Sequence, residues 1–120
     1  MSSEQRAIAD YFLEQARWRD QRAVEYPEDH RNSQSAAGLS ELAEYVLALP
    51  DDDERIIELT TLATRDGVFM PFREGSRITG RFRFGWPDQD CGAFLGELVR
   101  QTRLDALDFA REHGVIEGSA

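Results

Sequence analysis

Apolar residues recur with the spacing of an α-helix over most of the chain. The first such stripe consists of Ile8, Phe12 and Ala16. Ser2 and Gln5 have the spacing of a capping box, which marks a helix start. Pro27 disfavours helical geometry in Tyr26, the residue before it. The pattern therefore predicts a first helix that begins close to Ser2 and ends near Tyr26.

Two more helices are predicted before residue 67. The polar segment 27–35 indicates a loop in which Asn32 or Ser33 caps the second helix. That helix should span 34–49, because its apolar positions follow an i, i+3, i+4, i+7 stripe and Pro50 stops it: Ala36, Leu39, Leu42, Ala43, Val46, Leu47 and Leu49. The acidic run 51–53 supplies a cap for a third helix, which Gly67 should end.

The stretch 67–90 departs from the helical pattern and alternates in the manner of a strand. Apolar residues and glycine occupy one side, and three arginines and a threonine occupy the other: Ile78, Gly80, Phe82, Phe84 and Trp86 against Arg77, Thr79, Arg81 and Arg83. This predicts a hairpin in which 68–73 pairs with 77–84 through a turn at 74–76. An ordered aromatic loop held by the same side chains is the alternative.

A last helix should open at Pro87 and Asp88 and end at His113 and Gly114. Its apolar arc is wide, so it should contact two neighbouring helices, or one helix and a second copy of the chain. The apolar positions are Phe94, Leu95, Leu98, Val99, Leu104, Leu107 and Ala110. The fold class predicted is mainly α: about four helices in a small bundle, with an aromatic and arginine-rich β-hairpin or ordered loop between helices three and four. Residues 1–114 should form a single domain, 115–120 a flexible tail, and the protein a homodimer.

Composition narrows the function classes. The chain has 120 residues, a net charge of -9 and a pI of about 4.6, which disfavours general attraction to nucleic acid or anionic membrane. All 14 basic residues are arginine, which excludes lysine Schiff-base chemistry and the phosphate-loop lysine. A single cysteine, Cys91, excludes an internal disulfide, and the polar start predicts no signal peptide. We therefore expect a cytoplasmic protein without a membrane span or a cofactor.

Two acid pairs are the only candidates for a metal centre that several helices could share. Glu41 with Glu44, and Asp105 with Asp108, are each three residues apart and so lie on one helical face. This pattern resembles the all-α nucleoside triphosphate pyrophosphatases, whose helices present paired acids to Mg²⁺, although the doubled acid that opens that family's first motif is missing. The resemblance implies a metal-dependent nucleotide hydrolase. The alternative is that both pairs lie on solvated helix faces.

Other single residues have simpler explanations. The acidic runs at 51–54 and at Asp88 and Asp90 could bind a hard cation, but they are also what helix N-termini favour. Cys91 could be a nucleophile near a helix start, or a small core residue.

The arginines and aromatic residues of 67–90 form the candidate contact surface. Its members are Phe69, Phe72, Arg73, Arg77, Arg81, Arg83 and Trp86. The sequence thus favours a small non-enzymatic interaction or regulatory module that uses this segment to bind a protein partner or a second copy. The alternative is a local anion or nucleic-acid site, because guanidinium groups bind carboxylate or phosphate and aromatic rings can stack on a ligand. The arginines could also pair internally with acids of neighbouring helices.

Overall fold

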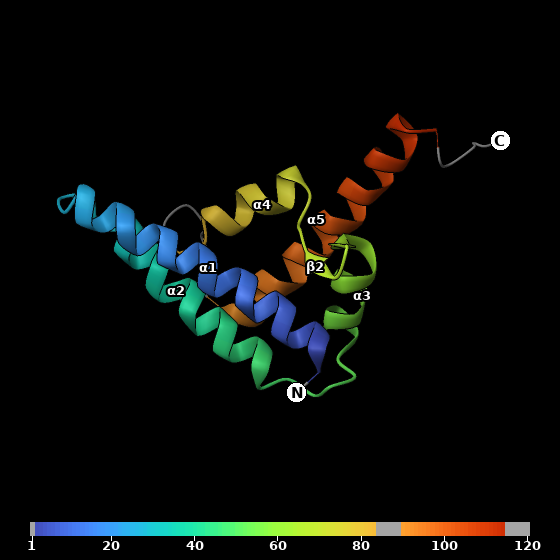
Figure 1. The fold of residues 1–120 in the computed structure, drawn as a ribbon, viewed down its shortest axis with the longest axis horizontal. Coiled ribbons are helices and arrows are strands. Elements are labelled where there is room, and N and C mark those ends of the chain that lie inside the picture. Colours follow the sequence, from blue (N-terminus) through green and yellow to red (C-terminus); the bar gives the residue numbers. More distant parts are fainter. Residues whose placement is uncertain (1, 84–89, 115–120) are drawn as a thin grey trace.

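The computed structural model describes residues 2–83 and 90–114 and is mainly helical (Figure 1). Within these ranges the elements are five helices and two short strands: α1 (Ser3–Glu25), α2 (His30–Leu47), α3 (Glu54–Ala63), β1 (Thr64–Arg65), β2 (Val68–Phe69), α4 (Arg73–Gly80) and α5 (Cys91–Glu112). Among them, no helix is both long enough and apolar enough to span a membrane.

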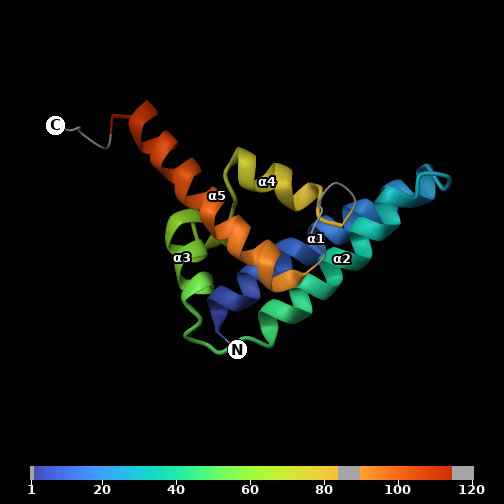
Figure 2. The ribbon, with the colours of Figure 1, turned by 180° about the vertical axis from the view of Figure 1, so that it is seen from behind.

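The first two helices lie side by side as an antiparallel pair that extends from the rest of the molecule (Figures 1 and 2). The predicted capping box is present, since Ser2 Oγ accepts from the Gln5 amide and Gln5 Oε1 accepts from the Ser2 amide. The helix ends at Glu25, as the following Tyr26 and Pro27 predicted. Helix α2 begins earlier than expected, because Asp29 caps it in place of Asn32 or Ser33.

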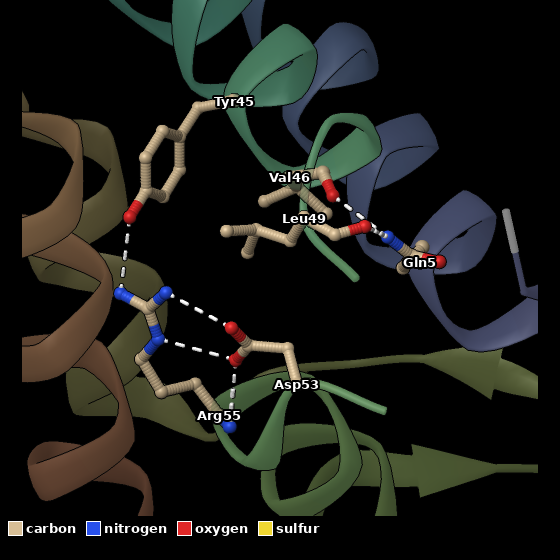
Figure 3. A network of polar contacts seen from close by, with 6 residues as sticks. All are labelled: Gln5, Tyr45, Val46, Leu49, Asp53 and Arg55. Atoms are coloured by element: carbon tan, nitrogen blue, oxygen red, sulfur yellow. Dashed lines mark hydrogen bonds and ion pairs between the residues drawn. The ribbon is translucent and has the colours of Figure 1, made fainter. Parts of the chain in front are cut away.

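Polar side chains join the ends of these helices to α3 (Figure 3). Gln5 is buried, and its Nε2 donates to the carbonyls of Val46, at 3.0 Å, and Leu49, at 2.7 Å. It therefore supplies hydrogen bonds to carbonyl groups at the C-terminal end of α2 and just after it. Asp53 caps α3 by accepting from the Arg55 amide, and the Arg55 guanidinium reaches the Tyr45 hydroxyl at 3.1 Å. The predicted cap from the acidic run 51–53 is therefore confirmed.

The core lies where α5 crosses the α1–α2 pair and packs along α3 (Figure 2). Its largest fully buried side chains come from all four of these helices and from the segment after α4: Ile8, Phe12, Leu39, Leu42, Ile56, Leu59, Phe82, Phe94, Leu95 and Leu98. The ring centroids of Phe82 and Phe94 are 4.4 Å apart. Phe82 thus anchors the chain between α4 and α5.

A two-stranded antiparallel hairpin does lie between the third and fourth helices, but its residues differ from those predicted. Thr64 pairs with Phe69 and Arg65 with Val68, around a turn in which Asp66 and Gly67 have positive φ. Helix α3 consequently ends at Ala63 rather than at Gly67. The glycine that resembles a helix stop instead turns the hairpin, because it adopts φ 77° without a Cβ penalty.

The predicted strand at 77–84 is wrong, since 73–80 forms α4. The turn proposed at 74–76 lies inside this helix. Buried Gly75 and Thr79 are four residues apart and face inward together, and exposed Arg73 and Arg77 have the same spacing on the outside. In a segment this short, residues that alternate with period two include pairs four positions apart, which also share one face of a helix. The pattern of 73–80 therefore fits both a strand and a helix. Residues 2–83 and 90–114 therefore form five helices rather than about four.

The start of the last helix is described from Asp90, which caps α5 by accepting from the Ala93 amide at 2.8 Å. The predicted opening at Pro87 and Asp88, the expected strand positions Phe84 and Trp86, and the expected tail 115–120 lie outside the described residues.

Candidate functional site

Helix α4 owes its position to side chains from other helices. Its N-cap residue, Phe72, makes no side-chain capping hydrogen bond. The buried carboxylate of Asp105 on α5 takes that role, since Oδ2 accepts from the Gly75 amide at 3.0 Å and Oδ1 accepts from Gln101 Nε2 at 2.8 Å. At the other end, Arg19 of α1 donates to the Gly80 carbonyl. Both ends of α4 are thus held by groups whose charges complement its dipole.

In this position, α4 has a row of guanidinium groups along one side. Arg73, Arg77 and Arg81 recur every four residues and are all exposed, and we call these three residues the arginine face. Arg77 pairs with Glu74 at 2.9 Å. Within the part of the chain that the structure describes, Arg73 and Arg81 form no ion pair with an acidic side chain. The arginine face therefore keeps donors directed at solvent.

The arginine face borders a hollow of about 470 Å³ between α1 and α4. Its lining residues are basic, neutral polar or glycine: Gln15, Arg19, Arg73, Ser76, Arg77, Gly80 and Arg81. Arg19 also donates to Asn32 Oδ1 at 3.1 Å. Burial lowers the pKa of Arg19, the nearby positive charges of Arg22 and Arg31 lower it further, and the negative charge of Asp29 partly offsets them. The region around this hollow is thus electropositive, and an anion there would relieve repulsion among fixed cations.

Arg83, which the sequence placed with the other arginines, lies elsewhere. It has φ 75° and forms an ion pair with Glu41 of α2 at 2.7 Å. Its side chain packs so closely on Gly38 that a Cβ there would come within 2.3 Å of the Arg83 Cγ. For Arg83 the internal-pairing alternative is therefore the one that the structure supports, and this residue fastens the segment after α4 onto α2.

The aromatic candidates are largely structural. Phe69 is only 2% exposed and packs edge-on against Tyr11, with ring centres 5.5 Å apart. Phe72 is half-buried between the ring of Phe109, at 5.7 Å, and the guanidinium of Arg65, at 4.5 Å. These rings support the hairpin and the start of α4 rather than offer a stacking face. Trp86 lies outside the described residues.

The four acids considered as metal ligands do not come together. Glu41 of α2 pairs with Arg83, and Asp105 caps α4. Asp108 is exposed, and its Oδ1 lies 3.7 Å from Nη1 of Arg111. Glu44 is exposed on α2. Among the described residues, no three His, Cys, Asp or Glu side chains are grouped as a metal would require. Asp105 in particular has a structural partner that explains its burial.

Cys91 is half-buried at the first turn of α5, and burial raises the pKa of its thiol. Arg83 lowers the pKa and Glu41 and Asp90 raise it, each by less than burial does. A raised pKa keeps the thiol protonated at neutral pH, which disfavours a nucleophilic role.

Comparison with family models, with curated proteins and with solved structures finds no match to this chain. We therefore infer the function of this chain from the geometry of the site. Sequence reasoning included the three residues of the arginine face but missed Arg19, which looks like one more polar position on α1. The spacing of Arg73, Arg77 and Arg81 was the signal that could have identified a helical face.

Proposed function

We propose that this protein is a small non-enzymatic binding module that recognises an anionic group through the arginine face. The observation that carries the proposal is the hollow between α1 and α4, where Arg19 and the arginine face converge and none of the lining residues that the structure describes is acidic. Planar guanidinium groups bind carboxylate and phosphate by paired, charge-assisted hydrogen bonds. Arg83 has no part in this site, because it is committed to Glu41.

The charge of the whole chain restricts the kind of anion. With a net charge of -9, the protein repels a long polyanion at distance, and attraction is confined to the immediate surroundings of α4. A Debye length of about 8 Å at physiological salt limits the reach of both effects. A ligand with a few localised negative charges fits this situation better than a nucleic acid does.

Titration of the full chain with inorganic pyrophosphate and with a fluorescein-labelled oligoglutamate peptide tests the proposal. We expect binding that weakens as salt is added, and a loss of roughly tenfold or more in the double variant Arg77→Gln, Arg81→Gln, because two charge-assisted contacts are removed. Arg111→Gln is the control for one lost charge, since this arginine lies exposed near the end of α5. No binding of either probe at low salt, or an equal loss in the control, would refute the proposal.

We also propose that the chain forms a homodimer, with α5 as the contact. Leu104 and Leu107 lie on one face of this helix and are 44% and 39% exposed. They are the part of the predicted wide apolar arc that the other helices leave uncovered.

A further inference from the structure

A second hollow continues from the one beside the arginine face. It has a volume of about 620 Å³ and lies between the first half of α1 and the segment 67–71, and Gln15 and Ser76 line both hollows. In Figure 1, α1 runs below both β2 and α4. The two hollows adjoin along α1, where the Tyr11 hydroxyl lies 3.5 Å from Ser76 Oγ, and we call the two together the groove.

The two ends of this groove differ in chemistry. The end near β2 exposes Val68 and Met70, at 56% and 47%, beside the ring of Tyr11. We call this end the apolar end. Its charged lining residues are Arg6, Asp10 and Glu14, so acids outnumber bases there. The other end is the electropositive hollow described above. The groove therefore changes from apolar and weakly acidic to basic along its length.

We infer that the anionic ligand is a short extended segment of a partner protein that carries an acidic residue and a large apolar residue. This inference rests on the function proposed above. The acidic residue binds the arginine face, and the apolar residue packs at the apolar end against Met70, Val68 and Tyr11. Each half of such a segment complements the half of the groove that it contacts.

The length of the groove sets the spacing of the two residues. Tyr11 and Arg19 are eight residues apart on α1, which at 1.5 Å per residue corresponds to about 12 Å. An extended peptide advances about 3.3 to 3.6 Å per residue. The acidic and apolar residues of the ligand should therefore be about three or four positions apart.

The same chemistry disfavours a uniform polyanion in this groove. A nucleic-acid strand that followed it would bring phosphates against Asp10 and Glu14 and would leave Val68 and Met70 in contact with charged groups. Only the half of the groove beside α4 suits phosphates.

Three labelled peptides of equal length test the inference on the full chain. The first carries glutamates and, four positions away, a leucine; the second has serine in place of that leucine; the third has glutamines in place of the glutamates. We expect the first peptide to bind about fivefold to tenfold tighter than the second, as partial burial of one leucine side chain predicts. The third should bind weakly.

Variants separate the two ends. Met70→Ser should weaken the leucine peptide but leave the serine peptide unchanged, whereas Arg77→Gln should weaken both. Val24→Ser, at an 82% exposed position near the end of α1, is the matched control and should change neither. Met70 is itself exposed, so its substitution should preserve the fold, which a thermal melt checks.

The outcomes distinguish this inference from the proposal beneath it. Equal affinity for the leucine and serine peptides, with both weakened by Arg77→Gln, would overturn the apolar contact and leave the anion site in place. A single-stranded oligonucleotide that bound more tightly than the leucine peptide would overturn the inference in favour of a phosphate ligand. If the glutamine peptide bound as well as the glutamate peptides, both the inference and the proposed function would fail.

Discussion

At the residue scale, a few buried or half-buried polar side chains complete the hydrogen bonding of helix ends. Gln5 shows this most clearly, because one side chain serves the first turn of α1 through Oε1 and the last turn of α2 through Nε2 (Figure 3). Sequence spacing alone predicted the first of these roles. The second role depends on the antiparallel packing of the two helices, which brings residues about forty positions apart into contact.

We predict that Gln5→Leu lowers the free energy of unfolding by about 1 to 3 kcal/mol, because the Leu49 carbonyl loses the donor that Gln5 Nε2 provides and the Val46 carbonyl loses one of its donors. Gln21→Leu, at an exposed position of the same helix, is the control and should change stability by less than about 0.5 kcal/mol. Urea unfolding followed by circular dichroism measures both. Equal effects in the two variants would contradict the capping role.

Tyr11 should give the protein a measurable alkaline transition. Burial raises the pKa of its hydroxyl above the ordinary 10.0, and hydrogen bonds with Ser76 and Thr79 only partly offset this. Since the folded state binds the phenolic proton more tightly than the unfolded state does, this contribution to stability is full below pH 10 and is lost as the pH rises through the folded pKa. We predict that Tyr11→Phe makes the unfolding free energy less dependent on pH above 10, as urea unfolding at each pH would show. A slope that stayed the same would refute this.

At the element scale, α4 is where sequence reasoning and structure differ most. Helices of about this length are marginal on their own, and α4 contains Gly75 and Gly80 and lacks a capping side chain at Phe72. Its local sequence therefore gives a weak helical signal, and the alternation of Ile78, Gly80 and Phe82 suggested a strand. The decisive stabilisation comes from Asp105 and Arg19, which no short window of sequence contains. The capping box of α1 was predictable because both of its partners are local.

Removing the remote cap should therefore affect α4 before the rest of the molecule. We predict that Asp105→Ala lowers the free energy of unfolding by about 0.5 to 2 kcal/mol, the usual value of an N-cap, and speeds amide exchange in 73–80 more than in α1 or α2. Asp108→Ala removes an exposed acid from the same helix and is the control. Hydrogen exchange measured by mass spectrometry resolves these segments. Uniform acceleration across all helices in Asp105→Ala would mean that the carboxylate supports the core as a whole rather than α4.

At the scale of the whole molecule, hydrophobic periodicity predicted the mainly helical fold and most of the buried residues. The stripes of Ile8 and Phe12, of Leu39 and Leu42, and of Leu95 and Leu98 are all buried. Periodicity did not predict how the helices cross, and the site depends on that crossing. Arg19 joins the arginine face because α4 lies beside α1, whereas Arg83 leaves it because the chain turns onto α2 at positive φ.

The same packing leaves one apolar surface that predicts self-association. The last turns of α5 extend past the other helices (Figure 2), and Leu104 and Leu107 are exposed on one face of this helix. When two copies of such a helix pair antiparallel about a twofold axis, each face covers the other.

We predict a concentration-dependent dimer in sedimentation velocity, and a monomer for the double variant Leu104→Glu, Leu107→Glu, because four carboxylates would then meet at the contact. Leu13→Glu places one such carboxylate at a similarly exposed leucine of α1 and should leave the dimer intact. A wild-type chain that stayed monomeric at all concentrations would show that this face of α5 is simply solvated. The arginine face would be unaffected by that result, because its groove is built by α1, α4 and the hairpin of a single chain.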